Sequence, residues 1–346
     1  LLVCFGLSEI YSVALGQGAT DLLNFKKQVF FIVIGFVLFF TVAFIDYNFF
    51  RSFSIYFYII GATLLVLVLI FGITINGTKG WFNFGGVVFQ PVEFIKFVVV
   101  LFLAKYFSDS SFKISPLRHL VVSGGGVFLL FVLVLMQPDF GSGLLLFSVW
   151  LAMIVIAGFK KRYLAALFLA ITIIGAGSWM FYLKPYQKQR VMTFFDPSFD
   201  PLNQGYNVAQ AIIAVGSGRL LGRGIGFGSQ SQLKFLPESQ NDFIFAVISE
   251  ELGFLGIASV LTFFSILFFR SMLSIKRVKD DFGIFFILGA MSLIFIEMFI
   301  NIGMNMGLLP VVGIPLPLVS YGGSAMISNL IMLGVVQSII LRSRIR

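Results

Sequence analysis

Charged residues, cysteine and histidine are all scarce in this chain of 346 residues. Only 11% of the residues are charged and 59% are hydrophobic, whereas a soluble domain normally carries about 25% charged residues. Cys4 is the only cysteine, which excludes an intrachain disulfide and a cysteine-based metal site. His119 is the only histidine, which excludes histidine-rich metal sites and argues against Ser-His catalysis. The composition therefore predicts a polytopic membrane protein.

Long apolar runs fill most of the sequence. A helix needs about 20 mostly apolar residues to cross a bilayer, so the runs predict an all-α fold with about ten transmembrane helices. The predicted spans are Leu1–Gly16, Gln28–Ile45, Phe53–Ile73, Pro91–Phe107, Leu117–Met136, Gly141–Gly158, Tyr163–Leu183, Asp242–Arg270, Phe282–Met304 and Leu318–Leu341. We expect one transmembrane domain over residues 1–346, with residues 184–241 as a large loop between the seventh and eighth helices. The apolar run at the start is not interpreted as a cleaved signal peptide.

Basic residues are distributed unevenly between the loops. The formal net charge is +9, but the Lys and Arg residues fall in short clusters between apolar runs, which indicates membrane orientation rather than nucleic-acid binding. Fourteen of them fall in one set of loops, and only Lys26, Lys27 and Lys79 fall in the opposite short loops. Because short cytoplasmic loops are enriched in Lys and Arg, both termini are predicted to be cytoplasmic. The long loop is then extracytoplasmic.

The segment LPESQNDFIFAVISEELG, residues 236–253, places Asp242 where the long loop meets an apolar run. A carboxylate at a membrane boundary can stay ionised toward water while it faces a lipid-borne substrate, as a general base requires. A helix N-cap is the alternative, because Asp before an apolar run accepts backbone N–H groups. Glu238 is a second acid that could serve from the loop.

Polar residues also lie near the predicted outer ends of other spans. Glu93 and Lys96 in QPVEFIK are three residues apart, so they share a helical face. They form either a structural ion pair or a phosphate contact in which Glu93 orients Lys96. Asp139 in QPD caps the next helix, shares an outward-facing cavity with Asp242, or does both. Arg190 in YQKQR is either a pyrophosphate ligand or a solvated loop charge.

Several other segments have a less specific pattern. GSGRLLGRG lacks the ending of a nucleotide P-loop, and GYNVAQAIIAVGSG fits an interfacial helix. The segment GMNMGLLPVVGIPLPLVSYGGSA carries three prolines and no charge, and irregular backbone at membrane depth indicates the wall of a cleft. A functional role and helix packing both stay open for the acids inside predicted spans, which are Glu9, Glu250, Glu251 and Glu297.

Taken in order, these motifs resemble the SEDS family of bacterial cell-wall polymerases, which includes RodA, FtsW and SpoVE. The resemblance extends nearly end to end, through IYSVA, GWFNFGGVVFQPVEFIK, QPDFGSG, the long loop, LPESQNDFIF and GIPLPLVSYGGSA. The last segment is more similar to RodA, the elongation member, than to FtsW. Residues 239–241 depart from the usual pattern because they lack its histidine, so a histidine base is not required here.

The resemblance implies a glycosyltransferase that polymerises lipid II into β-1,4 glycan strands at the outer face of the bacterial cytoplasmic membrane during cell elongation. It assigns the essential acid to Asp242. The candidates for substrate binding are Glu93, Lys96, Asp139, Arg190 and Glu238. A divalent cation, Mg²⁺ or Mn²⁺, is the one cofactor considered, and its ligands are unknown.

The expected partners are lipid II, membrane lipids, a class B penicillin-binding protein and the elongation complex, and no nucleic acid is expected. Three alternatives stay open: a lipid II flippase or transporter, a non-catalytic scaffold, and a division-specific polymerase like FtsW. The polar groups at the predicted outer ends of spans argue against transport, because transporters bind their substrates near the bilayer midplane.

Overall fold

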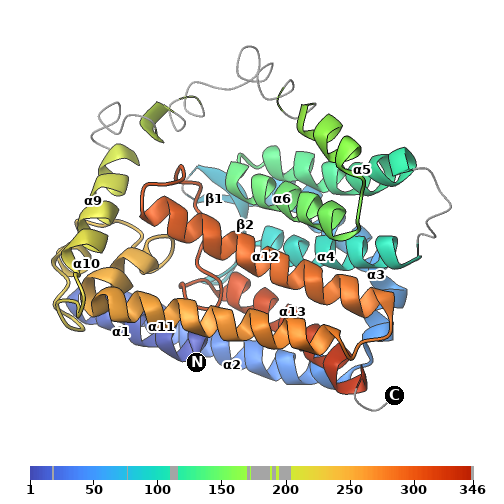
Figure 1. Cartoon of the computed structure of the whole chain (residues 1–346). Coiled ribbons are helices and arrows are strands. Elements are labelled where there is room, and N and C mark those ends of the chain that lie inside the picture. The colour runs from blue at the N-terminus through green and yellow to red at the C-terminus, as the bar shows by residue number, and fades with distance from the viewer. Residues whose placement is uncertain are drawn as a thin grey trace.

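A computed structural model describes residues 1–17, 19–75, 77–109, 116–169, 172, 188, 192–194 and 204–343. Long helices packed side by side dominate the fold (Figure 1). The elements are α1 (Leu2–Gln17), α2 (Ala19–Phe44), α3 (Tyr47–Phe71), β1 (Ile73–Ile75), β2 (Thr78–Phe84), β3 (Val87–Phe89), α4 (Pro91–Asp109), α5 (Pro116–Leu135), α6 (Phe140–Ile156), α9 (Gln204–Ser217), α10 (Ser229–Gln232), α11 (Ile244–Ile275), α12 (Asp281–Asn305) and α13 (Gly323–Ser343).

Within the described residues, six helices are long and apolar enough to cross a membrane: α2, α3, α5, α11, α12 and α13. The helices α1 and α6 are apolar but shorter, and α4 has 19 residues with an ion pair inside it. Nine of the predicted spans coincide with described helices, whereas Tyr163–Leu183 lies largely outside the described residues. The chain is a multi-pass, mostly helical membrane protein, and the total of ten spans stays a prediction.

The centre of the fold is formed by α4 and α12. Both helices are buried on several faces, as expected of helices that are apolar all round, and α4 packs against α3, α6 and α12. The longest side-by-side contact joins α2 and α13. Gly334 allows this approach, because a Cβ at that position would lie 2.8 Å from the carbonyl oxygen of Phe39.

A small antiparallel sheet before α4 was not predicted from the sequence. The strand β2 pairs with β1 on one side and with β3 on the other, and Gly85 and Gly86 provide the positive φ angles of the second turn. Strands this short inside a glycine-rich loop are too brief to show the alternation of apolar and polar residues that predicts a β-strand. The sheet anchors the end of α5, because the Lys79 N–H donates to the carbonyl of Gln137 at 3.2 Å.

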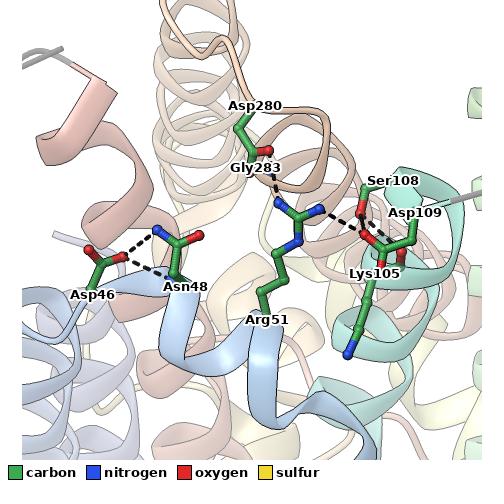
Figure 2. Close-up of polar contacts among 8 residues, drawn as sticks. All are labelled: Asp46, Asn48, Arg51, Lys105, Ser108, Asp109, Asp280 and Gly283. Atoms are coloured by element: carbon green, nitrogen blue, oxygen red, sulfur yellow. Dashed lines mark hydrogen bonds and ion pairs between the residues drawn. The ribbon is translucent and has the colours of Figure 1, made fainter.

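A cluster of ion pairs joins the helix ends on the side predicted to be cytoplasmic (Figure 2). Arg51 on α3 donates to Asp109 at the end of α4 at 2.7 Å and to Asp280, the N-cap of α12, at 3.2 Å. Asp46 caps α3 by accepting the N–H of Asn48. Because the three side chains of the Arg51 cluster are about a third or more exposed, each pair contributes roughly 0–1 kcal/mol.

The helix α11 is interrupted at Gly253, which adopts φ 63° and ψ −155°. The glycine-rich run of residues 216–228 lies against this break. The N–H groups of Phe254 and Leu255 donate to the carbonyls of Arg219 and Leu220 at 2.9 and 3.2 Å. The run therefore satisfies backbone groups that the break would otherwise leave unpaired.

The helix predicted in the long loop is present as α9. Ala211 and Ala214 are fully buried in a small apolar cluster that includes Phe243, Ala246 and Val247. The described part of the long loop is thereby packed onto the start of α11, next to Asp242. Whether α9 also lies in the membrane interface stays a prediction.

Candidate functional site

Asp242 lies in the turn that leads into α11. The helix begins at Ile244 and its N-cap is Phe243, which makes no side-chain cap bond, so the N-cap interpretation of Asp242 is wrong. The physical reason is the turn itself, in which the N–H groups of Asn241 and Phe243 donate to the carbonyl of Glu238 at 3.0 and 3.4 Å. Among the described residues, the carboxylate of Asp242 accepts no hydrogen bond, which leaves it available to a ligand.

The backbone of Asp242 is held by two asparagines of α12. The side-chain amides of Asn301 and Asn305 both donate to the Asp242 carbonyl at 2.9 Å. Asn301 also donates to the carbonyl of Ile314 at 2.8 Å, and the Asn305 amide oxygen accepts the Ala246 N–H at 3.2 Å. Both asparagines are fully buried, so these bonds form away from competing water. They fix the position of Asp242 while leaving its carboxylate unengaged.

The proline-rich segment between α12 and α13 lies beside this turn, and we call this segment the wall. The Ser320 hydroxyl donates to the carbonyl of Asn241 at 2.6 Å, and the Tyr321 N–H donates to the carbonyl of Gln240 at 2.8 Å. Gly313 brings the wall close to the acid, because a Cβ at this position would lie 3.4 Å from Oδ2 of Asp242. The segment is thus an ordered part of the site, as the sequence indicated.

Asp242, Glu238 and Asp139 come together in the fold. Burial is the main cause that raises the pKa of Asp242 from its ordinary 3.8 to about 7, and the negative charges of Glu238 and Asp139 raise it further. Asp139 also caps α6, because its carboxylate accepts the Ser142 N–H at 3.0 Å. An acid that titrates near neutral pH is suited to general-base chemistry.

Close backbone packing joins Asp139 to the wall. Gly141, in the first turn of α6, lies so near the wall that a Cβ there would be 2.1 Å from the carbonyl oxygen of Val312. Val312 precedes Gly313, which faces Asp242. The start of α6, the wall and the start of α11 therefore surround one site.

Glu93 and Lys96 form the predicted pair, with Nζ of Lys96 2.8 Å from Oε1 of Glu93. A third member, Glu297 on α12, lies 2.8 Å from the same nitrogen, and all three side chains are buried. Glu297 precedes Asn301 by four residues, so both lie on one face of α12. The triad therefore sits one helical turn from the asparagine that holds Asp242.

The triad places two carboxyl groups around one ammonium group, and the hollow beside it is narrow. Glu93, Lys96, Ser328 and Asn329 contribute to its lining, and the space is too small for a water molecule. The Lys96 ammonium is thus enclosed by its two carboxylates in this conformation. The geometry favours the structural ion pair over a ready phosphate contact.

Arg190 lies outside the described residues. Four further residues of the site were not predicted from the sequence: Asn301, Asn305, Ser320 and Gln28. Gln28 donates to the Ser320 carbonyl at 3.3 Å and accepts the N–H of Gly322 at 3.1 Å. A signal for the asparagines was present, since two asparagines four residues apart inside an apolar run share a face and must find polar partners.

Carboxylates are the only titratable metal-ligand type gathered at this site. In the part of the chain that the structure describes, no group of three or more His, Cys, Asp or Glu residues could hold a metal ion. One or two carboxylates together with substrate phosphates are nevertheless a usual ligand set for Mg²⁺.

The chain matches the family described as cell cycle protein (FtsW, RodA and SpoVE) over residues 1–345. It is 38% identical over 319 residues to the peptidoglycan glycosyltransferase MrdB of Escherichia coli (strain K12), which covers 92% of this chain and 86% of that protein. It is 37% identical over 355 residues to the stage V sporulation protein E of Bacillus subtilis (strain 168), with 99% and 95% covered.

Solved structures agree with these relatives. A chain from a peptidoglycan synthase complex, studied for its coordination of polymerization and crosslinking, superposes with a TM-score of 0.82 at 28% identity, covering 99% of this chain and 97% of that one. The rod shape determining protein RodA of Thermus thermophilus has the same fold, with a TM-score of 0.73 at 24% identity and coverage of 100% and 94%.

Proposed function

This chain belongs to the FtsW, RodA and SpoVE family of cell cycle proteins, and we propose that it is a peptidoglycan glycosyltransferase that polymerises lipid II during cell elongation. One observation carries the assignment of the acid. Asp242 is held by its carbonyl while its carboxylate stays unengaged, at a place where its pKa is about 7. A relative that is 38% identical bears the name peptidoglycan glycosyltransferase.

In the proposed reaction, Asp242 acts as general base. It takes the proton from the 4-hydroxyl of one lipid II sugar as that oxygen attacks the anomeric carbon of the growing strand. The bond from that carbon to the lipid pyrophosphate breaks, and attack from the opposite face converts an α linkage into a β-1,4 bond. Proton transfer by a positioned base contributes about 10²–10⁴ in rate.

The departing pyrophosphate needs positive charge around it. We assign this first to Arg190, because a guanidinium grips phosphate oxygens with a fork of N–H groups. Lys96 could reach the leaving group only by exchanging a carboxylate partner, so we propose that it mainly holds α4 against α12. Glu238 and Asp139 would face the acceptor sugar beside Asp242.

A divalent cation enters the proposal together with the pyrophosphate. When bound, it would supply charge neutralisation at the leaving group. Asp139 and Glu238 are the residues of this chain that could complete its ligands. Removal of divalent ions should then weaken donor binding while leaving the unfolding temperature of the ligand-free protein unchanged.

The reaction requires the site to open outside the bacterial cytoplasmic membrane, where we place the long loop, with both termini in the cytoplasm. We further propose a class B penicillin-binding protein as partner, in keeping with a similar chain solved within a synthase complex that polymerises and crosslinks. A flippase would instead need its charged groups near midplane and accessible from both sides, whereas Lys96 is enclosed.

The test is polymerisation of purified lipid II by the purified protein, with and without the partner. Wild type should give glycan ladders, and Asp242→Ala, shown to be folded by its unfolding temperature, should give none. If the protein moves labelled lipid II across vesicle membranes without forming glycan ladders, its function is transport rather than polymerisation. Full activity of the folded Asp242→Ala variant would remove Asp242 from the mechanism.

A further inference from the structure

A second group of acids lies away from Asp242, where α1, α10 and the broken part of α11 meet. The helix α1 contacts both α10 and α11 (Figure 1). Glu9 on α1 and Glu250 and Glu251 on α11 are fully buried. Burying a carboxylate without an ion-pair partner is costly, so each of these three acids is expected to have polar partners.

Glu250 and Glu251 are both well supplied with donors. Glu250 accepts the Gln230 N–H at 3.0 Å and lies 3.9 Å from the guanidinium of Arg223. Oε2 of Glu251 accepts a hydrogen bond from the Ser12 hydroxyl and another from the Gly226 N–H, at 3.1 Å. Oε1 of Glu251 accepts from two side chains of α10, the Ser231 hydroxyl at 3.4 Å and the Gln232 amide at 3.3 Å.

Glu9 differs from both. Its two carboxylate oxygens are buried and have no hydrogen-bond partner, and no ion pair reaches it from the described residues. Glu9 precedes Ser12 by three residues, so the two share a face of α1, and the Ser12 hydroxyl donates to Glu251. The orphaned carboxyl group therefore faces the region of Glu251.

We propose that Glu9, Ser12 and Glu251 form a binding site for a small monovalent cation of the Na⁺ class. The Glu251 carboxylate already accepts hydrogen bonds from neutral donors, and Arg223 lies beside Glu250. An ionised Glu9 has no such partner, and one monovalent cation would balance its charge. Both oxygens of Glu9, Oε2 of Glu251 and the free lone pairs of the Ser12 hydroxyl are the hard oxygen ligands such a cation takes.

The cation would join α1 to α11 close to the break at Gly253, about three helical turns beyond Asp242. Interrupted helices are a recurring setting for Na⁺ in membrane proteins, because their unwound backbone carbonyls coordinate the ion. The site is separate from the proposed polymerase chemistry, so its test uses binding and stability rather than activity.

The test is thermal unfolding of the full chain in detergent, in choline chloride and then in NaCl or KCl at constant pH and ionic strength. Ligands that bind only the folded state raise its stability in a saturable way, so Na⁺ should raise the wild-type midpoint by a few degrees. Glu9→Gln should abolish this response and raise the midpoint in choline. Glu250→Gln, the matched control, should keep the response. Titration calorimetry of NaCl into wild type and Glu9→Gln should show binding to the wild type alone.

Two results would overturn the proposal. One is a wild-type midpoint that ignores Na⁺ and K⁺ and follows pH alone, which would mean that a proton resides on Glu9. The other is an unchanged Na⁺ response or heat of binding in Glu9→Gln. If Glu9→Gln fails to fold, Ser12→Ala replaces it, and there the Na⁺ concentration needed for half the shift should rise.

Discussion

The side-chain amide of Asn305 donates to the backbone carbonyl of Asp242 at 2.9 Å, across 63 residues of sequence. This contact holds Asp242 by its backbone carbonyl, so the oxygens of its carboxylate are not used in the hydrogen bond. A base held in this way is positioned before substrate arrives, and its lone pairs stay free for the proton it must take.

The first prediction concerns the acid itself. Asp242→Asn keeps the size of the side chain and removes its basicity, so kcat/KM for lipid II polymerisation should fall by about 10²–10⁴. The measurement is the rate of glycan strand formation from purified lipid II. Asp280→Asn, which alters the distant Arg51 cluster, serves as the control and should retain activity.

The pH profile should report the same group. Because the base must be ionised and the pKa of Asp242 is about 7, kcat/KM should rise with pH and level off above about 7. Glu238→Gln removes a neighbouring negative charge that raises this pKa, so the rising limb should move to lower pH. A profile whose limb does not move in Glu238→Gln would contradict the proposed electrostatic coupling.

Stability should depend on pH in the opposite direction. The pKa of Asp242 is about 7 in the folded protein and its ordinary value is 3.8, so the folded state holds the proton over a pH range where the unfolded chain has lost it. The free energy of unfolding should therefore fall as pH rises from about 4 to 7. In Asp242→Asn this fall should be smaller, as measured by denaturation across that range.

Two cations that each contact two carboxylates should differ sharply in their effect on stability. Lys96→Met leaves Glu93 and Glu297 buried without a cation, which should lower the free energy of unfolding by about 3–5 kcal/mol. Arg51→Met breaks two exposed pairs and should cost roughly 0–2 kcal/mol. Equal losses, measured by chemical denaturation in detergent, would show that burial does not control the cost.

The asparagine clamp can be tested separately from the acid. Asn301→Leu removes one of the two donors to the Asp242 carbonyl and leaves the Ile314 carbonyl without its donor, and a buried group left unsatisfied costs about 1–3 kcal/mol. We expect a lower kcat with the acid's pH midpoint near its original value, since the carboxylate itself is unchanged. A variant with full kcat would show that Asn305 alone is sufficient to position the acid.

Composition and the lengths of the apolar runs were sufficient to predict the class of the protein and most of its helices. Apolar runs of about 20 residues must bury their backbone polar groups in helices when they lie in lipid, so composition and length predicted nine of the described helices. The pairing of Glu93 with Lys96 was also readable, because a spacing of three residues places both on one helical face. The distance between two residues along a helix is enough to predict that they share a face, even when the fold is unknown.

Only the tertiary structure decided which distant residues meet. Glu297 joining Lys96, the two asparagines holding Asp242 and the glycine-rich run closing the break at Gly253 are contacts between helices far apart in sequence. Burial raises the pKa of Asp242, and a turn that the sequence pattern does not specify excludes the alternative capping role. Helix formation follows from local periodicity, but packing depends on how complete surfaces fit together.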